Sequence, residues 1–485
     1  MPRLLLALAW LAASLAWLDA DRLVRDGDEE GHVGAAELFL GQLASGDLAG
    51  FLRDAWMGDL GEYPPLFPAL VGAWWHLLGG GQPGEAPVRA VCLGGLLLAA
   101  WATGRLAASA HGAAGSSRGD GLPPGAAAGT LACGLTLCLP LATGLSRHFM
   151  PEGLLVGAVA TSVWLAWRAA DRPGPATAAA LGLALGLGLL VKQTFVLLAV
   201  VPVAVAALRA GRWLGLSAAI AAVVAGPWYL RHMGEQLAYG QQSVAASADA
   251  TASLTTVLGY YPATALWLGL GPVLAVLGTG AALVLLARAR RGGRSALILG
   301  LAWGLGGLLL LAAVPKKYPR LMAPLTPAVA LLAGAALAHL PRRRLGLAVA
   351  LPPAAAWVAG ASLVPISEPA FVPQADPRCL QAWLRPAVDD DLGLAAVADA
   401  SARARPGPVV VTGGPDIPCS VQTTHPWASH LAPYLRREGQ EREVLTDGRG
   451  AVRVDWTRDQ ARRGGVWVDV PALDSGFALD HRPAR

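Results

Sequence analysis

The chain has 485 residues, of which 54% are hydrophobic and 15% charged, and its formal net charge is +5. A soluble chain of this length would form two or three domains with roughly 25% charged residues, and a mean hydropathy of +0.47 excludes that class. The basic residues lie mostly at the ends of apolar blocks, which is the pattern that orients a membrane protein rather than one that binds nucleic acid. The composition therefore predicts a multi-pass membrane protein.

Apolar blocks long enough to cross about 30 Å of hydrocarbon as a helix recur along the first three quarters of the chain. The predicted fold class is mainly α, a polytopic helical membrane protein with about 11 to 13 spans. The first block also has the features of a cleaved signal peptide, but Trp10, Trp17 and the many spans that follow favour a retained helix. The predicted helices are 4–18, 65–79, 88–109, 126–146, 153–169, 176–191, 194–208, 213–229, 263–287, 296–314, 321–340 and 345–364.

Arginines gather in alternate short loops, and such loops are predominantly cytoplasmic in membrane proteins. Twelve spans would bring the C-terminal tail to the cytoplasmic side, whereas the arginine pattern places it outside. An odd number of crossings is therefore expected, and the short segment 65–79 is the one that would be re-entrant. The cytoplasmic loops contain Arg168 and Arg172, Arg209 and Arg212, Arg288 to Arg294, and Arg342 to Arg344, and the outward segments are 147–152, 192–193, 230–262, 315–320 and everything after 365.

The composition changes near residue 365, which predicts two domains. Residues 1–365 form the membrane domain, with a first outward loop at 19–64, and residues 366–485 form a small extracytoplasmic α/β domain. In this tail Cys379 and Cys419 lie where a disulfide is chemically permitted. Its predicted strands are 408–413, 451–456 and 465–470, and its predicted helices are 390–404 and 426–437.

The first outward loop reads DGDEEGHVGAAE at residues 26–37. Apolar residues recur after it at helical spacing, which predicts a helix with one face on the bilayer and with Asp28 at its N-terminus. Three interpretations remain open for the acids: helix capping, a calcium loop, or catalysis. The calcium pattern is that of an EF-hand, a divalent-cation site formed by Asp26, Asp28, Glu30 and Glu37.

Further charged residues are expected on the same outward side. His148 and Glu152 begin one span, Lys192 lies in the turn between two others, and Lys316, Lys317 and Arg320 precede one of the last spans. Each has a plainer interpretation, because lysines at span ends also extend to the lipid headgroups and His148 lacks the paired spacing of a metal ligand. Four aromatic residues flank the 230–262 loop and are expected in an aromatic belt at the interface, with sugar stacking as the alternative. They are Trp228, Tyr229, Tyr260 and Tyr261.

The order of several motifs resembles the GT-C membrane glycosyltransferases. The nearest likeness is to the bacterial relatives of dolichyl-phosphate-mannose protein mannosyltransferases and to lipid A aminoarabinose transferases, and it covers roughly residues 1–340. The motifs are DE in the first outward loop, YPPL from Tyr63, SR followed by a proline and an acid, GLxLLxKxTF around Lys192, GPWYLR, and KKxxRxxxPLxP.

The resemblance implies an enzyme of the bacterial cytoplasmic membrane that moves a sugar from a polyprenyl-phosphate carrier to a protein, glycolipid or polysaccharide acceptor on the outer face. Asp28 and Glu29 match the family's catalytic base, and transfer by one displacement inverts the anomeric centre. Lys192, Lys316, Lys317 and Arg320 would bind the donor phosphate, and Glu152, His148 and Tyr63 would orient the substrate. Glu152 departs from the family, whose members often have Asp there. The alternatives are a transporter or flippase of a lipid-linked sugar, in which the same charges line a path, and a non-catalytic scaffold.

Overall fold

The computed structural model describes the helical part of the chain and the strands of the tail. The described residues are 2–20, 27–58, 63–79, 85–110, 123–208, 211–245, 259, 261–262, 270–289, 294–313, 319–340, 342–363, 409–412, 444–445, 452–457, 466–470 and 475–480. The chain divides into two compact units, one formed by Met1–Ala16 with Ala35–Ala361 and one by Trp17–Gly34 with Ser362–Arg485.

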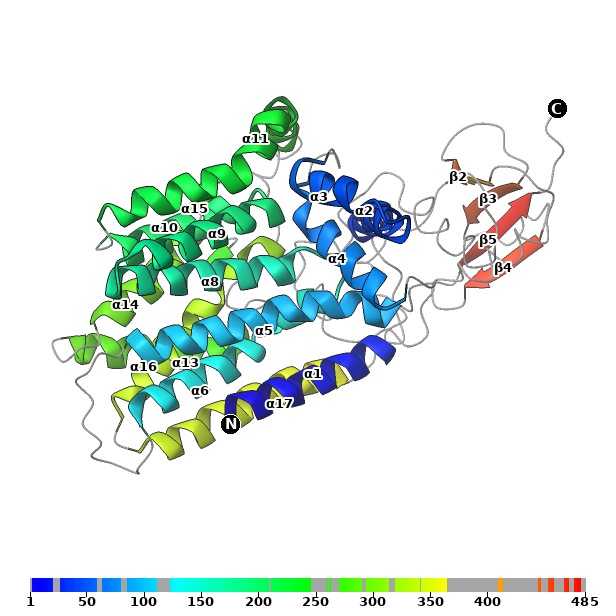
Figure 1. Cartoon of the computed structure of the whole chain (residues 1–485). Coiled ribbons are helices and arrows are strands. Elements are labelled where there is room, and N and C mark those ends of the chain that lie inside the picture. Colours follow the sequence, from blue (N-terminus) through cyan, green and yellow to red (C-terminus); the bar gives the residue numbers. More distant parts are fainter. Residues whose placement is uncertain are drawn as a thin grey trace. The chain divides into compact units, whose positions relative to one another are not determined.

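Helices dominate the first unit, as the hydropathy predicts (Figure 1). Six helices within the described residues are long and apolar enough to cross a membrane. Four shorter apolar helices coincide with predicted blocks, so the multi-pass membrane class is confirmed. The helices are α1 (Pro2–Ala20), α2 (Gly27–Ala44), α3 (Leu48–Met57), α4 (Leu66–Leu77), α5 (Glu85–Ala110), α6 (Pro124–Leu137), α7 (Pro140–Ser146), α8 (Glu152–Asp171), α9 (Pro175–Val191), α10 (Phe195–Ala207), α11 (Trp213–Ala245), α13 (Gly271–Ala287), α14 (Arg294–Leu301), the π-helix η4 (Ala302–Gly306), α15 (Gly307–Ala313), the 3₁₀-helix η5 (Pro319–Leu325), α16 (Pro327–Ala338) and α17 (Arg343–Leu363).

One predicted span and one predicted loop differ from their expected form. The block 126–146 is broken into α6 and α7, which meet at an angle of 61°. The break precedes Pro140, whose ring and missing N–H prevent the helix from continuing. The predicted outward loop 230–262 also begins too early, because α11 continues as helix to Ala245.

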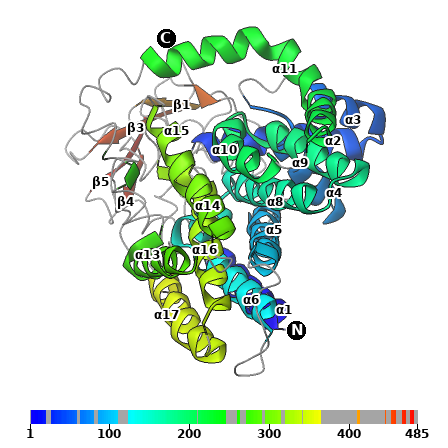
Figure 2. The ribbon, with the colours of Figure 1, turned by 90° about the vertical axis from the view of Figure 1, so that its left-hand side faces the viewer.

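Glycines let several helices approach closely, as the run GLALGLGLL predicts. A Cβ placed on Gly182 would collide with the backbone of Ser217, and one placed on Gly186 with the side chain of Val224, so α9 and α11 pack closely. The same holds for α5 and α8, where a Cβ on Gly95 would collide with the backbone of Gly153. Figure 1 shows α5 and α8 side by side, and Figure 2 shows α13, α14 and α16 beside one another.

The tail of the second unit contains a five-stranded mixed sheet. Its strand order is β2-β1-β3-β5-β4, with β1 parallel to both β2 and β3 and with β5 antiparallel to β3 and β4. Strands predicted at 408–413, 451–456 and 465–470 correspond to β1, β3 and β4 and are confirmed. The predicted tail helices, Cys379 and Cys419 lie outside the described residues. The strands are β1 (Val409–Thr412), β2 (Val444–Leu445), β3 (Val452–Thr457), β4 (Val466–Val470) and β5 (Ser475–Asp480).

Candidate active site

Three charged side chains from different parts of the membrane unit meet at the start of α8. Lys192 Nζ donates a hydrogen bond of 2.6 Å to Glu152 Oε1, and Arg320 Nε lies 3.6 Å from the same oxygen. All three residues are at most 5% exposed. Because one carboxylate faces two cations, the group carries a formal charge of +1 and is suited to an additional anion.

Local sequence explains how each of these residues reaches its place. Pro151 precedes α8, so Glu152 occupies the first turn, where the helix dipole favours a negative charge. Lys192 lies in the extended break between α9 and α10. Arg320 lies in η5, a short 3₁₀-helix that contains Pro319 and Pro324 and leads into α16.

Lys192 does not extend to the membrane surface, so the plainer interpretation of this residue is wrong. Its side chain is 6% exposed and is held by the carboxylate of Glu152. Its Nζ also lies 5.7 Å from the ring centroid of Tyr63, within the range of a cation–π contact. The structure thus brings together four residues that the sequence predicts for one site: Tyr63, Glu152, Lys192 and Arg320.

The connection 147–151 between α7 and α8 is also buried and contains further polar groups. His148 is 5% exposed and lies four residues before Glu152, and Arg320 Nη1 lies 3.7 Å from the sulfur of Met150. Arg89 of α5 donates a 2.7 Å hydrogen bond to the carbonyl of Arg147, which fixes the connection against α5.

Arg89 and Arg147 were not among the residues that the sequence predicts for the site. Arg147 belongs to the SR motif, and its Nη2 donates a 3.4 Å hydrogen bond to Ser14 of α1. The sequence contained a signal for Arg89. With 65–79 re-entrant, the block 88–109 begins on the outward side, and an arginine there runs against the usual excess of basic residues on the cytoplasmic side.

One oxygen of the central carboxylate remains available for a ligand. Glu152 Oε2 is buried, and none of the described residues donates a hydrogen bond to it. Such an oxygen is costly to bury without a donor. A substrate hydroxyl would satisfy it.

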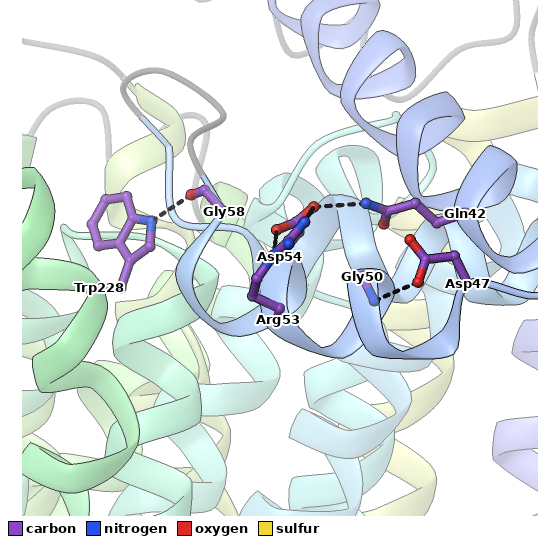
Figure 3. Close-up of polar contacts among 7 residues, drawn as sticks. All are labelled: Gln42, Asp47, Gly50, Arg53, Asp54, Gly58 and Trp228. Carbon is purple, nitrogen blue, oxygen red and sulfur yellow. Dashed lines mark hydrogen bonds and ion pairs between the residues drawn. The ribbon is translucent and has the colours of Figure 1, made fainter.

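The GPWYLR motif fixes the elements around this group instead of forming an interfacial belt. Trp228 is fully buried, and its Nε1 donates a 3.1 Å hydrogen bond to the carbonyl of Gly58 at the end of α3 (Figure 3). Tyr229 Oη donates to the carbonyl of Leu189, three residues before Lys192. The belt prediction for Trp228 is therefore wrong, because this ring is a core residue that joins α11 to α3.

Polar contacts also order the turn between α2 and α3 and the helix α3 itself (Figure 3). Asp47 caps α3 by accepting a 2.8 Å hydrogen bond from the N–H of Gly50. Asp54 accepts hydrogen bonds from Gln42 and Arg53, and these bonds lower the pKa of its carboxyl group, that from Arg53 most. The segment that follows the acidic loop is therefore a packed element.

The acidic loop itself is helical where the structure describes it. The helix α2 begins at Gly27, so the backbone of Asp28 and Glu29 lies in its first turn, and their side chains lie outside the described residues. The helix prediction is confirmed. Its face does not rest on lipid as expected, since Ala36 and Phe39 are fully buried and pack on Gly72 of α4.

The calcium-loop interpretation does not fit this backbone. An EF-hand loop folds around its ion, whereas a continuous helix from Gly27 to Ala44 spreads residues 27–37 over about 15 Å. Within the residues that were described, no group of three or more His, Cys, Asp or Glu side chains could hold a metal ion. Asp26, Lys316 and Lys317 lie outside that part of the chain.

Comparisons with known proteins agree with the resemblance that the motifs carry. A family model described as dolichyl-phosphate-mannose-protein mannosyltransferase matches residues 124–230. The crystal structure of ArnT from Cupriavidus metallidurans in the apo state aligns with a TM-score of 0.58 at 17% identity, covering 98% of this chain and 97% of that one. The structure of ArnT bound to undecaprenyl phosphate aligns with a TM-score of 0.57, at the same identity and coverage. No curated protein matches the sequence.

These likenesses confirm the predicted fold class. The structural alignments extend over nearly the whole chain. The matched family segment contains α6 to α10, the start of α11 and the charged residues Glu152 and Lys192.

Proposed function

We propose that this chain, which has the GT-C fold of membrane glycosyltransferases, transfers a sugar from a polyprenyl-phosphate carrier to an acceptor at the outer face of the cytoplasmic membrane. The observation that carries the proposal is the buried group of Lys192, Glu152 and Arg320. Burying three charges is costly, and the positive excess suits the anion that such a reaction releases. The undecaprenyl phosphate bound by ArnT is a lipid phosphate of the same chemical class.

The two buried cations are assigned to the donor phosphate. As the bond between the sugar and the phosphate breaks, negative charge grows on the phosphate oxygens, and preorganised cations in a site of low dielectric constant stabilise it. The guanidinium of Arg320 can bind two phosphate oxygens, whereas Lys192 acts as a point charge. Lys316 and Lys317, a few residues before Arg320, are proposed to join them.

Asp28 is proposed as the general base, with Glu29 beside it. The acceptor hydroxyl oxygen attacks the anomeric carbon, its proton passes to the Asp28 carboxylate, and the bond to the phosphate oxygen breaks with the electron pair on the phosphate. A single displacement of this kind inverts the anomeric configuration. Glu152 Oε2, together with His148 and Tyr63, is proposed to orient the sugar.

The test begins with cells with and without the gene, whose lipids and glycans are compared by mass spectrometry. A sugar missing from a defined acceptor identifies donor and acceptor together. The purified chain in nanodiscs is then assayed with that polyprenyl-phosphate sugar. Asp28→Asn should lower transfer by at least about 100-fold, because general base catalysis contributes that much, while insertion and yield stay unchanged.

The matched control is Glu37→Gln, which removes an acid from the same helix α2, about two and a half turns further on. It should retain normal transfer. Normal turnover in Asp28→Asn would remove the catalytic assignment. A chain that moved the lipid-linked sugar across vesicles without consuming it would instead be a flippase, and the glycosyltransferase proposal would fail.

A further inference from the structure

A second cluster of charge lies at the opposite end of α8 from Glu152. The helix has 20 residues, so its two ends are about 30 Å apart. At the Asp171 end is a cavity of about 420 Å³ between α1, α5, α6 and α8. Charged and aromatic side chains line it, namely Arg3, Arg105, Arg168, Arg172, Trp164 and Trp167. All belong to the membrane unit.

The orientation of the helices explains why these arginines converge. The helices α5 and α8 run in the same direction, since Gly95 contacts Gly153 near their starts and Trp101 contacts Trp164 further along, with ring centroids 4.7 Å apart. Their C-terminal ends therefore lie together. Arg3 Nη2 joins them from α1 and lies 3.4 Å from the carbonyl of Gly125 in α6.

The charges lining this cavity are unbalanced. Four arginines contribute, whereas Asp171 is the single carboxylate in the lining that the structure describes. Asp171 Oδ2 lies 3.8 Å from Arg172 Nε, so this carboxylate can offset one positive charge. The remaining excess favours an anion, and a planar guanidinium matches two oxygens of a phosphate.

The surroundings favour a phosphate that belongs to a lipid. The arginines lie at the ends of spans, and Trp164, whose ring centroid is 5.7 Å from the Arg168 guanidinium, is a residue type common at the headgroup level. An adjacent cavity of about 270 Å³ shares Trp167 and Asp171 and is lined by apolar residues of α10 and α14, including Val205 and Ile298. It can take the glycerol and upper acyl chain of such a lipid.

We propose that this arginine cavity binds the phosphate of an anionic phospholipid, in the leaflet opposite to the Glu152 site. Basic cavities between membrane helices on the cytoplasmic side are suited to anionic headgroups. The arginine pattern of the sequence predicts that same side for Arg168 and Arg172. The lipid would hold the ends of α1, α5 and α8 together, independently of the reaction proposed at the other end of α8.

The test uses native mass spectrometry of the full chain titrated with phosphatidylglycerol or with phosphatidylcholine. The wild type should retain phosphatidylglycerol selectively. The double variant R105Q/R168Q should bind it at least 10-fold more weakly, with phosphatidylcholine unaffected. Arg105 is exposed, so the single variant R105Q tests the same site without disturbing the packing should the double variant fail to fold.

The matched control is R212Q, which removes a guanidinium lying 5.1 Å from the Trp213 ring, on the same predicted side but outside the cavity. It should bind phosphatidylglycerol as the wild type does. Equal binding by the wild type, R105Q and R212Q would overturn the proposal. Binding of inorganic phosphate in neutral lipid, with no preference for phosphatidylglycerol, would assign the cavity to a free anion and also overturn the lipid assignment.

Discussion

Glu152→Gln tests whether the buried charges at the start of α8 depend on one another. Lys192 Nζ and Glu152 Oε1 are 2.6 Å apart, which corresponds to an attraction of about 6 kcal/mol at an effective dielectric constant near 20. The Arg320 contact at 3.6 Å adds about 5 kcal/mol on the same scale. Desolvation costs several kcal/mol per ion and offsets most of this.

The near-isosteric variant leaves two buried cations without their carboxylate. Removing one partner of a buried pair costs about 3 to 5 kcal/mol of the free energy of unfolding, and Glu152→Gln is expected at the upper end of that range. Lys192→Met should lower the free energy of unfolding by less, about 3 kcal/mol, because Glu152 keeps Arg320 as a partner.

The assay is unfolding by sodium dodecyl sulfate in mixed micelles, applied to both single variants and to the double variant. The double variant should be more stable than the sum of the single effects predicts, with a coupling energy of about 2 kcal/mol. Arg53→Gln is the matched control, since its ion pair with Asp54 is exposed and its loss should leave stability unchanged. A coupling energy below about 0.5 kcal/mol, or a fully stable Glu152→Gln variant, would refute the reasoning.

Three further predictions concern the donor cations, the acidic loop and the capping of α3. Arg320→Ala should raise the KM for the polyprenyl-phosphate donor by at least about 10-fold, since a hydrogen bond to a charged group contributes that much binding free energy. Equal effects on the donor KM and the acceptor KM would argue against a phosphate role for Arg320. The protein should have the same melting temperature in calcium and in a chelator, because residues 27–44 form a continuous helix. A higher melting temperature in calcium would restore the calcium-loop interpretation. Asp47→Ala should destabilise α3 by about 1 kcal/mol, seen as faster amide hydrogen exchange at residues 48–57 and not elsewhere; unchanged exchange would mean that the cap is not needed.

Several features of the site could be predicted because they depend on local sequence. The turn at Lys192 is predicted because one apolar block ends before it and another begins after it. The helix after Gly27 is predicted because acidic residues precede apolar residues at helical spacing. The close approach of α9 and α11 follows from glycines spaced along one helix. These patterns depend on neighbours within a few turns, so the sequence alone is sufficient to detect them.

Other features depend on contacts between distant segments. Hydropathy indicates that Glu152, Lys192 and Arg320 each lie at the end of a span, but only the packing of α8, α9 and η5 makes them share one carboxylate oxygen. The burial of Trp228 against Gly58 is decided in the same way. Its side chain is amphipathic and suits either an interface or a core, and the hydrogen-bond partner that decides between them is far away in the sequence.

The amino-acid sequence by itself determined the membrane class, most helix positions and the residue types available for chemistry, because apolar length and charge placement are properties of short segments. The tertiary structure decided which charges meet, where the block 126–146 bends by 61°, and that four arginines converge at the far end of α8. These outcomes follow from how helices pack in three dimensions, and that packing depends on shape complementarity between segments that no local pattern specifies.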